Sequence, residues 1–279
     1  MNQIKALIQT AVQQLQHSDS PQLDAQLLMA HALEVDRVWV MTWSDKEIEQ
    51  TQEAAFLDLL ARRIAGEPIA YILGQREFWG RDFFCNENTL IPRPDTEILI
   101  EQVLGLDLPQ QASVLDLGTG TGCIALTLAA ERPEWQVVAL DYSMEAMKVA
   151  EKNKAALKLN NVQIQQSDWY QVLPDGTEFD LIVANPPYID PASPYLKEGD
   201  VRFEPELALT SSNQGLDALQ TVTGLAPKYL KKGGWLAVEH GFDQAKLVYD
   251  CMSESGFRQI RQVPDLAGLD RCSYGCLSL

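Results

Sequence analysis

From residue 113 onward, short apolar runs alternate with amphipathic stretches, and this alternation restricts the possible folds more than any other feature of the sequence. The candidate strands are Val114–Leu117, Gln136–Leu140, Val162–Gln166, Leu181–Ala184, Trp235–Glu239, Phe257–Arg261 and Cys272–Leu277. The helical patterns between them include Ile124–Glu131, Ser143–Leu157, Gly215–Tyr229 and Asp243–Ser255. Such alternation gives a mainly parallel sheet that is covered on both faces. We therefore predict an α/β fold for residues 92–279.

The first 75 residues have a different pattern, in which apolar side chains recur at helical spacing. Three helices are predicted, over about 4–15, 21–33 and 45–65. Pro21 falls in the first turn of the second helix, and Gly66 caps the third. We interpret residues 1–75 as a small helical bundle, either purely structural or serving to dock a substrate.

The two parts are joined by residues 76–91, which we predict to form a β-hairpin linker. The aromatic run Phe78–Cys85 is typical of a strand, and Asn86–Asn88 supplies turn residues before Thr89–Ile91. The prolines of Pro92–Pro94 end this region. Asp95 or Thr96 is then expected to cap a helix that runs through Val103.

Charge and composition narrow the possible partners. The net charge is −17, and no basic stripe of the kind that binds duplex nucleic acid is visible, so we expect a protein partner and no direct nucleic acid. No apolar run is long enough to span a membrane, and the N-terminus has no signal-peptide pattern. Five scattered cysteines suit a reducing cytoplasm and form no evident metal site.

A glycine-rich loop, Asp116–Gly122, follows the first predicted strand of the α/β part and opens a helix. In an open parallel sheet such a turn lies at the carboxyl ends of the strands, where ligands bind. The dinucleotide fingerprint G-x-G-x-x-G fails, because Cys123 stands where its third glycine belongs. Asp116 suits the cationic amine of S-adenosylmethionine better than a pyrophosphate. A plain tight turn is the alternative reading.

Acidic residues end the next two strands. Asp141 could accept hydrogen bonds from both ribose hydroxyls of a cofactor, or it could simply cap the following helix. Asp168 could accept from an adenine amino group. Trp169 offers a packing surface for the cofactor, or it could be an ordinary core residue.

The apolar run 179–184 ends in Asn185-Pro186-Pro187-Tyr188. The prolines make the backbone rigid and remove two N–H donors, which leaves carbonyl oxygens as acceptors. The Asn185 side-chain oxygen and the Pro186 carbonyl could each accept one hydrogen of a planar NH2 group, and Tyr188 could cover its face. Alignment and electrostatics could then promote methyl transfer to that nitrogen. The alternative is a motif that merely terminates a strand.

In this order, the glycine loop, the two acids and Asn185–Tyr188 resemble class I methyltransferases that act on nitrogen. Flanking segments are similar to the bacterial release factor glutamine methyltransferases, the HemK or PrmC family. These segments are Gly66–Ile72, Glu77–Gly80, Thr89–Glu97, Gly199–Pro205, Glu239–Gly241 and Asp265–Arg271.

The resemblance implies a Rossmann-like seven-stranded sheet whose last strand is antiparallel. It also implies methyl transfer from S-adenosyl-L-methionine to the N5 amide nitrogen of the glutamine in the Gly-Gly-Gln loop of class 1 release factors. The residues expected to contact the cofactor, with Asp168 added from its position, are Gly118, Thr119, Gly120, Thr121, Gly122, Asp141, Asp168, Trp169 and Asn185. The residues expected to hold the glutamine are Asn185, Pro186, Pro187 and Tyr188. A nucleic-acid base methyltransferase and a non-catalytic binding module are the alternatives.

Overall fold

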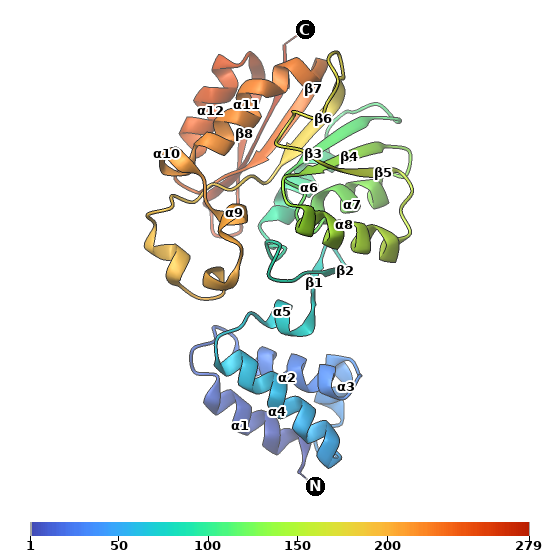
Figure 1. Cartoon of the computed structure of the whole chain (residues 1–279), viewed down its shortest axis with the longest axis vertical. Helices are drawn as coiled ribbons and strands as arrows, with labels where there is room; N and C mark the ends of the chain where they lie inside the picture. The colour runs from blue at the N-terminus through green and yellow to red at the C-terminus, as the bar shows by residue number, and fades with distance from the viewer. Residues whose placement is uncertain (1, 279) are drawn as a thin grey trace. The chain divides into compact units, whose positions relative to one another are not determined.

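The computed structural model describes residues 2–278, and the chain forms two compact units (Figure 1). Unit 1 contains the chain up to Gln75 together with Pro194–Phe203. Unit 2 contains Arg76–Ser193 and the chain from Glu204 onward. A short segment from the second half of the sequence therefore belongs with the N-terminal helices, which no local pattern indicates.

Unit 1 is a helical bundle with its own core, which includes Ile4, Leu28, Met29 and Phe56. Its helices are α1 (Ile4–Gln14), α2 (Pro21–Ala32), α3 (Arg37–Thr42), α4 (Gln50–Ile64) and α5 (Ile69–Leu73), with the short 3-10 helices η1 (Pro194–Lys197) and η2 (Val201–Phe203). The predicted helix over 45–65 begins only at Gln50, where Glu49 and Gln52 form a capping box.

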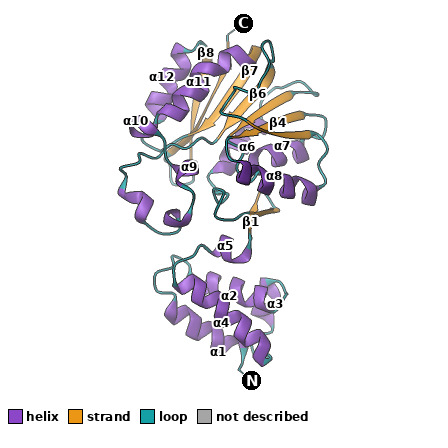
Figure 2. Ribbon diagram, in the orientation of Figure 1, coloured by secondary structure: helices purple, strands orange, loops and turns teal. Residues whose placement is uncertain are grey.

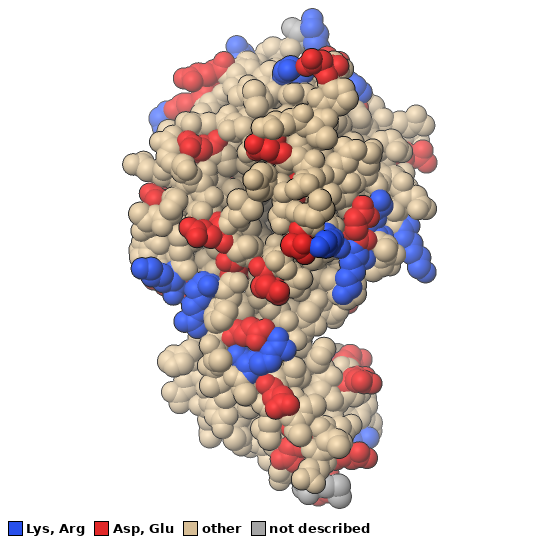
Figure 3. Space-filling view, in the orientation of Figure 1, with Lys and Arg blue, Asp and Glu red and all other residues tan. Residues whose placement is uncertain are grey.

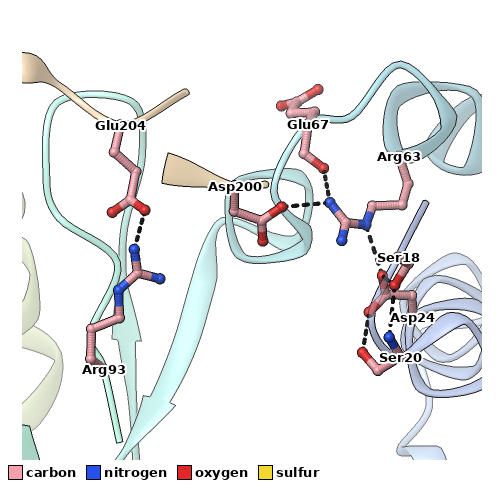
Figure 4. A network of polar contacts seen from close by, with 8 residues as sticks. All are labelled: Ser18, Ser20, Asp24, Arg63, Glu67, Arg93, Asp200 and Glu204. Carbon is pink, nitrogen blue, oxygen red and sulfur yellow. Dashed lines mark hydrogen bonds and ion pairs between the residues drawn. The ribbon is translucent and has the colours of Figure 1, made fainter. Parts of the chain in front are cut away.

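A single arginine, Arg63 at the end of α4, connects three parts of unit 1 (Figure 4). Its Nε donates to Asp24 of α2 at 2.7 Å, and its Nη1 donates to Asp200 at 2.9 Å and to the Glu67 carbonyl at 2.9 Å. Asp24 is only 2% exposed and also accepts from the Ser18 hydroxyl. This ion-pair network joins the 194–203 segment to the bundle.

The linker is a β-hairpin, as predicted, but its turn lies elsewhere. The strands are β1 (Gln75–Phe78) and β2 (Arg81–Phe84), joined by Trp79 and Gly80. Both joining residues have positive φ, 53° and 70°, which matches the two-residue turn that suits the twist of a hairpin. Asn86–Asn88 does form a turn, but Thr89–Ile91 after it is not a strand. The prediction of a strand there was wrong.

The sheet of unit 2 has seven strands in the order β5-β4-β3-β6-β7-β9-β8 (Figure 2). They are β3 (Ser113–Leu117), β4 (Gln136–Asp141), β5 (Val162–Gln166), β6 (Phe179–Ala184), β7 (Leu230–Glu239), β8 (Phe257–Pro264) and β9 (Asp270–Leu277). Neighbours from β5 to β7 pair in parallel, while β9 is antiparallel to both β7 and β8. The seven predicted strands and the antiparallel last strand are confirmed.

Helices cover both faces of this sheet (Figure 1). The helices that pack on it are α6 (Thr96–Leu104), α7 (Cys123–Glu131), α8 (Met144–Leu157), α11 (Asp217–Tyr229) and α12 (Ala245–Glu254). The short helices α9 (Glu206–Leu209) and α10 (Ser212–Gly215) precede α11 in the chain. Alternate strand residues enter different cores: Val114 packs with α6 and α7, whereas Leu115 packs with α11 and α12. Burial on both faces explains why a central strand such as β6 appears as a nearly continuous apolar run.

The surface carries the charge that the composition indicates. Figure 3 shows acidic side chains spread over the visible face of each unit, with lysines and arginines in small separate groups. Among residues 2–278, no helix is both long enough and apolar enough to cross a membrane.

Candidate active site

A cavity of about 380 Å³ lies within unit 2 at the carboxyl ends of the parallel strands. This is the edge where ligands bind in open α/β sheets. The predicted site residues that line it are Gly118, Thr119, Gly120, Thr121, Asp141, Asp168, Trp169, Asn185 and Pro187. Gly122, Pro186 and Tyr188 are not among its lining residues. The structure thus gathers four separate stretches of sequence around one space.

The glycine loop connects β3 to α7, and its residues 118–121 line the cavity. The backbone N–H groups of Gly118 and Thr119 donate to the Leu140 carbonyl at 2.8 and 3.0 Å, which fixes the loop against β4. Gly122 is the N-cap of α7 and has a φ of +82°, and a Cβ there would lie 2.8 Å from a methyl carbon of Leu126. Only glycine suits this position. Gly122 therefore determines the backbone conformation of the loop without lining the cavity itself.

Asp116 does not line the cavity. Its side chain is fully buried and accepts a hydrogen bond from the Thr119 hydroxyl at 2.6 Å. Burial raises the pKa of this carboxyl to about 7. The expectation that Asp116 faces the amine of a cofactor is not supported by this position.

Asp141 lies at the end of β4 and lines the cavity. Its Oδ2 accepts from the Gly120 N–H at 2.7 Å, and its Oδ1 accepts from the Ser143 N–H at 2.8 Å. Burial raises the pKa of this carboxyl. Ser143, whose hydroxyl accepts from the Ala146 N–H, is the N-cap of α8. The alternative role predicted for Asp141, as that helix cap, was therefore wrong.

Asp168 and Trp169 follow β5 and both line the cavity. The Asp168 side chain is exposed and accepts from the Gln171 amide at 2.8 Å. Trp169 packs against the sheet core and also lies about 4.0 Å from where a Cβ on Gly118 would be. The indole thus forms part of the cavity wall and part of the core, so both of its predicted roles are compatible with its position.

The Asn185–Tyr188 motif extends from β6 toward α6 and β7. Asn185 donates from Nδ2 to the Thr96 hydroxyl at 3.2 Å. Tyr188 donates from its hydroxyl to Glu239 at 3.2 Å, and its carbonyl accepts from Gln244 at 2.9 Å. Burial, together with the neighbouring Glu239 carboxylate, raises the pKa of the Tyr188 hydroxyl. Polar groups on three other elements therefore hold the motif in place.

Thr96 and Glu239 are the polar residues of this site whose contacts the sequence did not reveal. Thr96 was expected to be a possible cap of α6, but its hydroxyl donates to Glu239 at 2.6 Å. Asp95 occupies the N-cap position without a side-chain cap bond. Glu239 is the last residue of β7, which lies beside β6. An acidic residue at the end of such a strand is a sequence signal that could have identified Glu239 as a site residue. Burial raises the pKa of Glu239 to about 6.

Glu204 contacts the segment 91–93, which leads into α6 and forms part of the cavity wall. This carboxylate forms an ion pair with Arg93 (Figure 4). It also accepts a hydrogen bond from the Ile91 N–H at 2.9 Å. Pro92 and Arg93 line the cavity directly. Glu204 therefore fixes the backbone that leads to Thr96.

These residues fit S-adenosylmethionine. The cavity has the size of an ordinary small-molecule site, and two carboxylates and an indole line it, which are groups able to pair with ribose hydroxyls, an amino group and an adenine ring. Asp141 keeps lone pairs beyond its two backbone contacts, because each carboxylate has about four acceptor positions. Asn185 adjoins the same space, so a nitrogen held there would lie beside the cofactor.

Comparison with known proteins identifies relatives of both parts of the chain. The family described as PrmC N-terminal domain matches residues 6–74, and the family described as Methyltransferase small domain matches residues 94–195. A release factor glutamine methyltransferase from Shewanella oneidensis is 45% identical over 97% of this chain and 94% of its own length. One from Vibrio cholerae is 46% identical over 98% of this chain and 96% of its own length.

Solved structures share the fold at much lower identity. A methyltransferase from Pyrococcus furiosus matches with a TM-score of 0.55 and 18% identity, covering 80% of this chain and 99% of its own. A 16S ribosomal RNA methyltransferase from T. thermophilus, solved with AdoMet and guanosine, matches with a TM-score of 0.52 and 18% identity, covering 73% of this chain and 49% of its own. These likenesses concern the fold alone.

Proposed function

Because the chain belongs to the family of release factor glutamine methyltransferases, we propose that it methylates the side-chain N5 nitrogen of the glutamine in the Gly-Gly-Gln loop of class 1 release factors. The observation that carries the proposal is that Asn185 and Pro187 line the same cavity as the glycine loop and Asp141. A methyl donor and a planar amide can therefore meet there.

S-adenosylmethionine, when bound, supplies an electrophilic methyl group. The Asn185 oxygen and the Pro186 carbonyl would accept the two amide hydrogens, which fixes the nitrogen and increases its electron density. Gly118–Thr121, Asp141, Asp168 and Trp169 would hold the cofactor. These are the roles we propose for the predicted site residues.

The direct test uses labelled S-adenosylmethionine with a class 1 release factor. The wild-type factor should accept label, and a factor whose loop glutamine is replaced by alanine should accept none. Equal labelling of both would overturn the proposed target. Labelling of DNA or RNA at moderate salt would instead support a nucleic-acid methyltransferase. Cofactor binding without transfer to any of these would indicate a binding module.

We further propose that residues 1–75 dock the release factor. Three large apolar side chains on α3 and its C-terminal cap are exposed: Val38, Met41 and Trp43 are 69%, 52% and 49% exposed. Met41→Glu should then raise KM for the whole factor and leave KM for a short Gly-Gly-Gln peptide unchanged. Gln9→Glu on the exposed face of α1 adds the same single negative charge and serves as the matched control. An unchanged KM for the whole factor would count against docking at this surface.

We also propose a cytoplasmic location, where release factors act. All five cysteines are free thiols, which suits a reducing compartment. Fractionation of cells that express the tagged chain tests this, and recovery outside the cytoplasmic fraction would contradict it.

A further inference from the structure

Glu239, at the end of β7, is a buried carboxylate in contact with the Asn185–Tyr188 motif. Its exposure is 2%, and both of its oxygens accept hydrogen bonds from hydroxyl groups. Thr96 donates to Oε2 at 2.6 Å, and Tyr188 donates to Oε1 at 3.2 Å. An ionised carboxylate is an acceptor only, so each hydroxyl must direct its single hydrogen toward Glu239.

This arrangement determines which end of the Asn185 carboxamide faces Thr96. Because the Thr96 hydrogen is already committed to Glu239, its oxygen is available to Asn185 only as an acceptor. Asn185 must therefore present its NH2 group, and Nδ2 does donate to Thr96 at 3.2 Å. The Asn185 oxygen is consequently held at the opposite end of the amide.

A reversed carboxamide would not serve the proposed reaction. With its oxygen toward Thr96, Asn185 would direct its own NH2 hydrogens at the substrate NH2 group, and two donors would face each other. An asparagine by itself has no preference between the two orientations, since its oxygen and nitrogen ends have nearly the same shape. The preference has to come from its neighbours.

We propose that Glu239 is a positioning residue for methyl transfer: through the Thr96 hydroxyl it orients Asn185, and through the Tyr188 hydroxyl it fixes the end of the same motif. This inference rests on the proposed function and adds to it a group that does not touch the substrate. Glu239 and Thr96 are 143 residues apart in sequence, and the contact therefore depends on the assembled fold.

The test compares Thr96→Val with Thr96→Ser. Valine keeps the shape of the threonine side chain and removes the hydroxyl, whereas serine keeps the hydroxyl. Thr96→Val should lower kcat on a release factor by about tenfold or more, the size of effect expected for a lost preorganised contact, and Thr96→Ser should remain within about threefold of wild type. Thr96 lines the cavity, so the dissociation constant of S-adenosylmethionine and the melting temperature are measured for both.

Glu239→Gln is the second variant and remains informative if Thr96→Val does not fold. The glutamine can turn its NH2 group toward Thr96, which frees the threonine hydrogen to point at Asn185. We expect kcat to fall about tenfold while cofactor affinity stays within about twofold. Wild-type kcat in both variants, or a loss fully explained by weaker cofactor binding, would overturn the positioning role. Failure of the wild-type protein to label the release factor would overturn the proposed function instead.

Discussion

The Asp141 carboxylate accepts a hydrogen bond from the Gly120 backbone N–H at 2.7 Å, which ties the end of β4 to the glycine loop after β3. The same side chain is therefore needed for the shape of the loop as well as for the cofactor contact we propose. The contact with Gly120 has no local sequence pattern, because the two residues are 21 positions apart.

Asp141→Ala should raise the dissociation constant of S-adenosylmethionine about tenfold or more, because it removes the acceptor for Gly120 and for the proposed ribose hydroxyls. Asp141→Asn keeps one oxygen that can accept from the Gly120 N–H, so its dissociation constant for S-adenosylmethionine should rise less than that of Asp141→Ala. Calorimetric titration measures both. If the dissociation constant of the alanine variant equals that of wild type, Asp141 does not bind the cofactor and its role is structural.

Asn185→Ala should reduce kcat at least 100-fold and change cofactor affinity by less than about threefold, because the acceptor for the substrate amide is lost while most of the cavity wall remains. Single-turnover transfer to a release factor measures the rate, and equilibrium binding measures the affinity. A rate equal to that of wild type would contradict the role proposed for Asn185.

The sequence predicted the sheet well because its central strands are buried on both faces. The run 179–184, for example, is buried at every position, and a run of that kind remains recognisable without knowledge of its neighbours. The turn at Trp79 could not be predicted in the same way, since a positive φ is uncommon for an aromatic residue. The short helix α3 was missed because six residues contain too few turns for a periodic pattern.

The cavity was predicted in part. Gly118–Thr121, Asp141 and Asn185 were found because each directly follows a strand, and parallel strands end at one edge. The link from Glu239 to Thr96 joins β7 to α6 across 143 residues and has no signature in either segment. Assembly of the fold is what creates that part of the site.

Arg63→Ala should destabilise unit 1 by about 3 kcal/mol, because it leaves the buried Asp24 without its cation. Arg62→Ala is the matched control: its partner Glu67 is nearer the surface, and the Arg62 side chain is 45% exposed. The control should cost less than about 1 kcal/mol. Urea unfolding followed by tryptophan fluorescence measures both, and equal losses would show that the Arg63 network contributes no more than a surface pair.

Gly215→Ala should lower both stability and transfer rate. Gly215 has a φ of +84°, and an added Cβ would lie 2.1 Å from the Tyr188 carbonyl oxygen, so the Asn185–Tyr188 motif would have to move. Gly224→Ala in α11 is the control, since nothing lies within 4 Å of its added Cβ. That change should be neutral or stabilising by up to about 1 kcal/mol. A Gly215→Ala variant with wild-type kcat would show that the motif tolerates displacement.

Methyl transfer should depend on pH through Glu239. The pKa of Glu239 is raised from 4.5 to about 6, chiefly by burial, while the hydrogen bonds from Thr96 and Tyr188 partly offset this increase. Below that pH the carboxyl is protonated and one of its oxygens becomes a donor, so it no longer imposes one orientation on Thr96. The rate of transfer should therefore fall as pH decreases through about 6. The neighbouring thiols of Cys123 and Cys272 stay neutral throughout, since burial raises their pKa values.

The contribution of Glu239 to the free energy of unfolding should depend on pH in the opposite direction to the transfer rate: it should increase as pH decreases. The folded-state pKa of Glu239 lies above its unfolded value, so its contribution to stability is fully present below about pH 4.5 and is lost as pH rises through about 6.

Single-turnover rates between pH 5 and 8, measured for the wild-type protein and for Glu239→Gln, check the predicted pH dependence of methyl transfer. The glutamine variant should lack the decline near pH 6, because it has no carboxyl to protonate. A decline that persists in this variant would assign the titration to another buried group, such as Asp116 with its pKa of about 7.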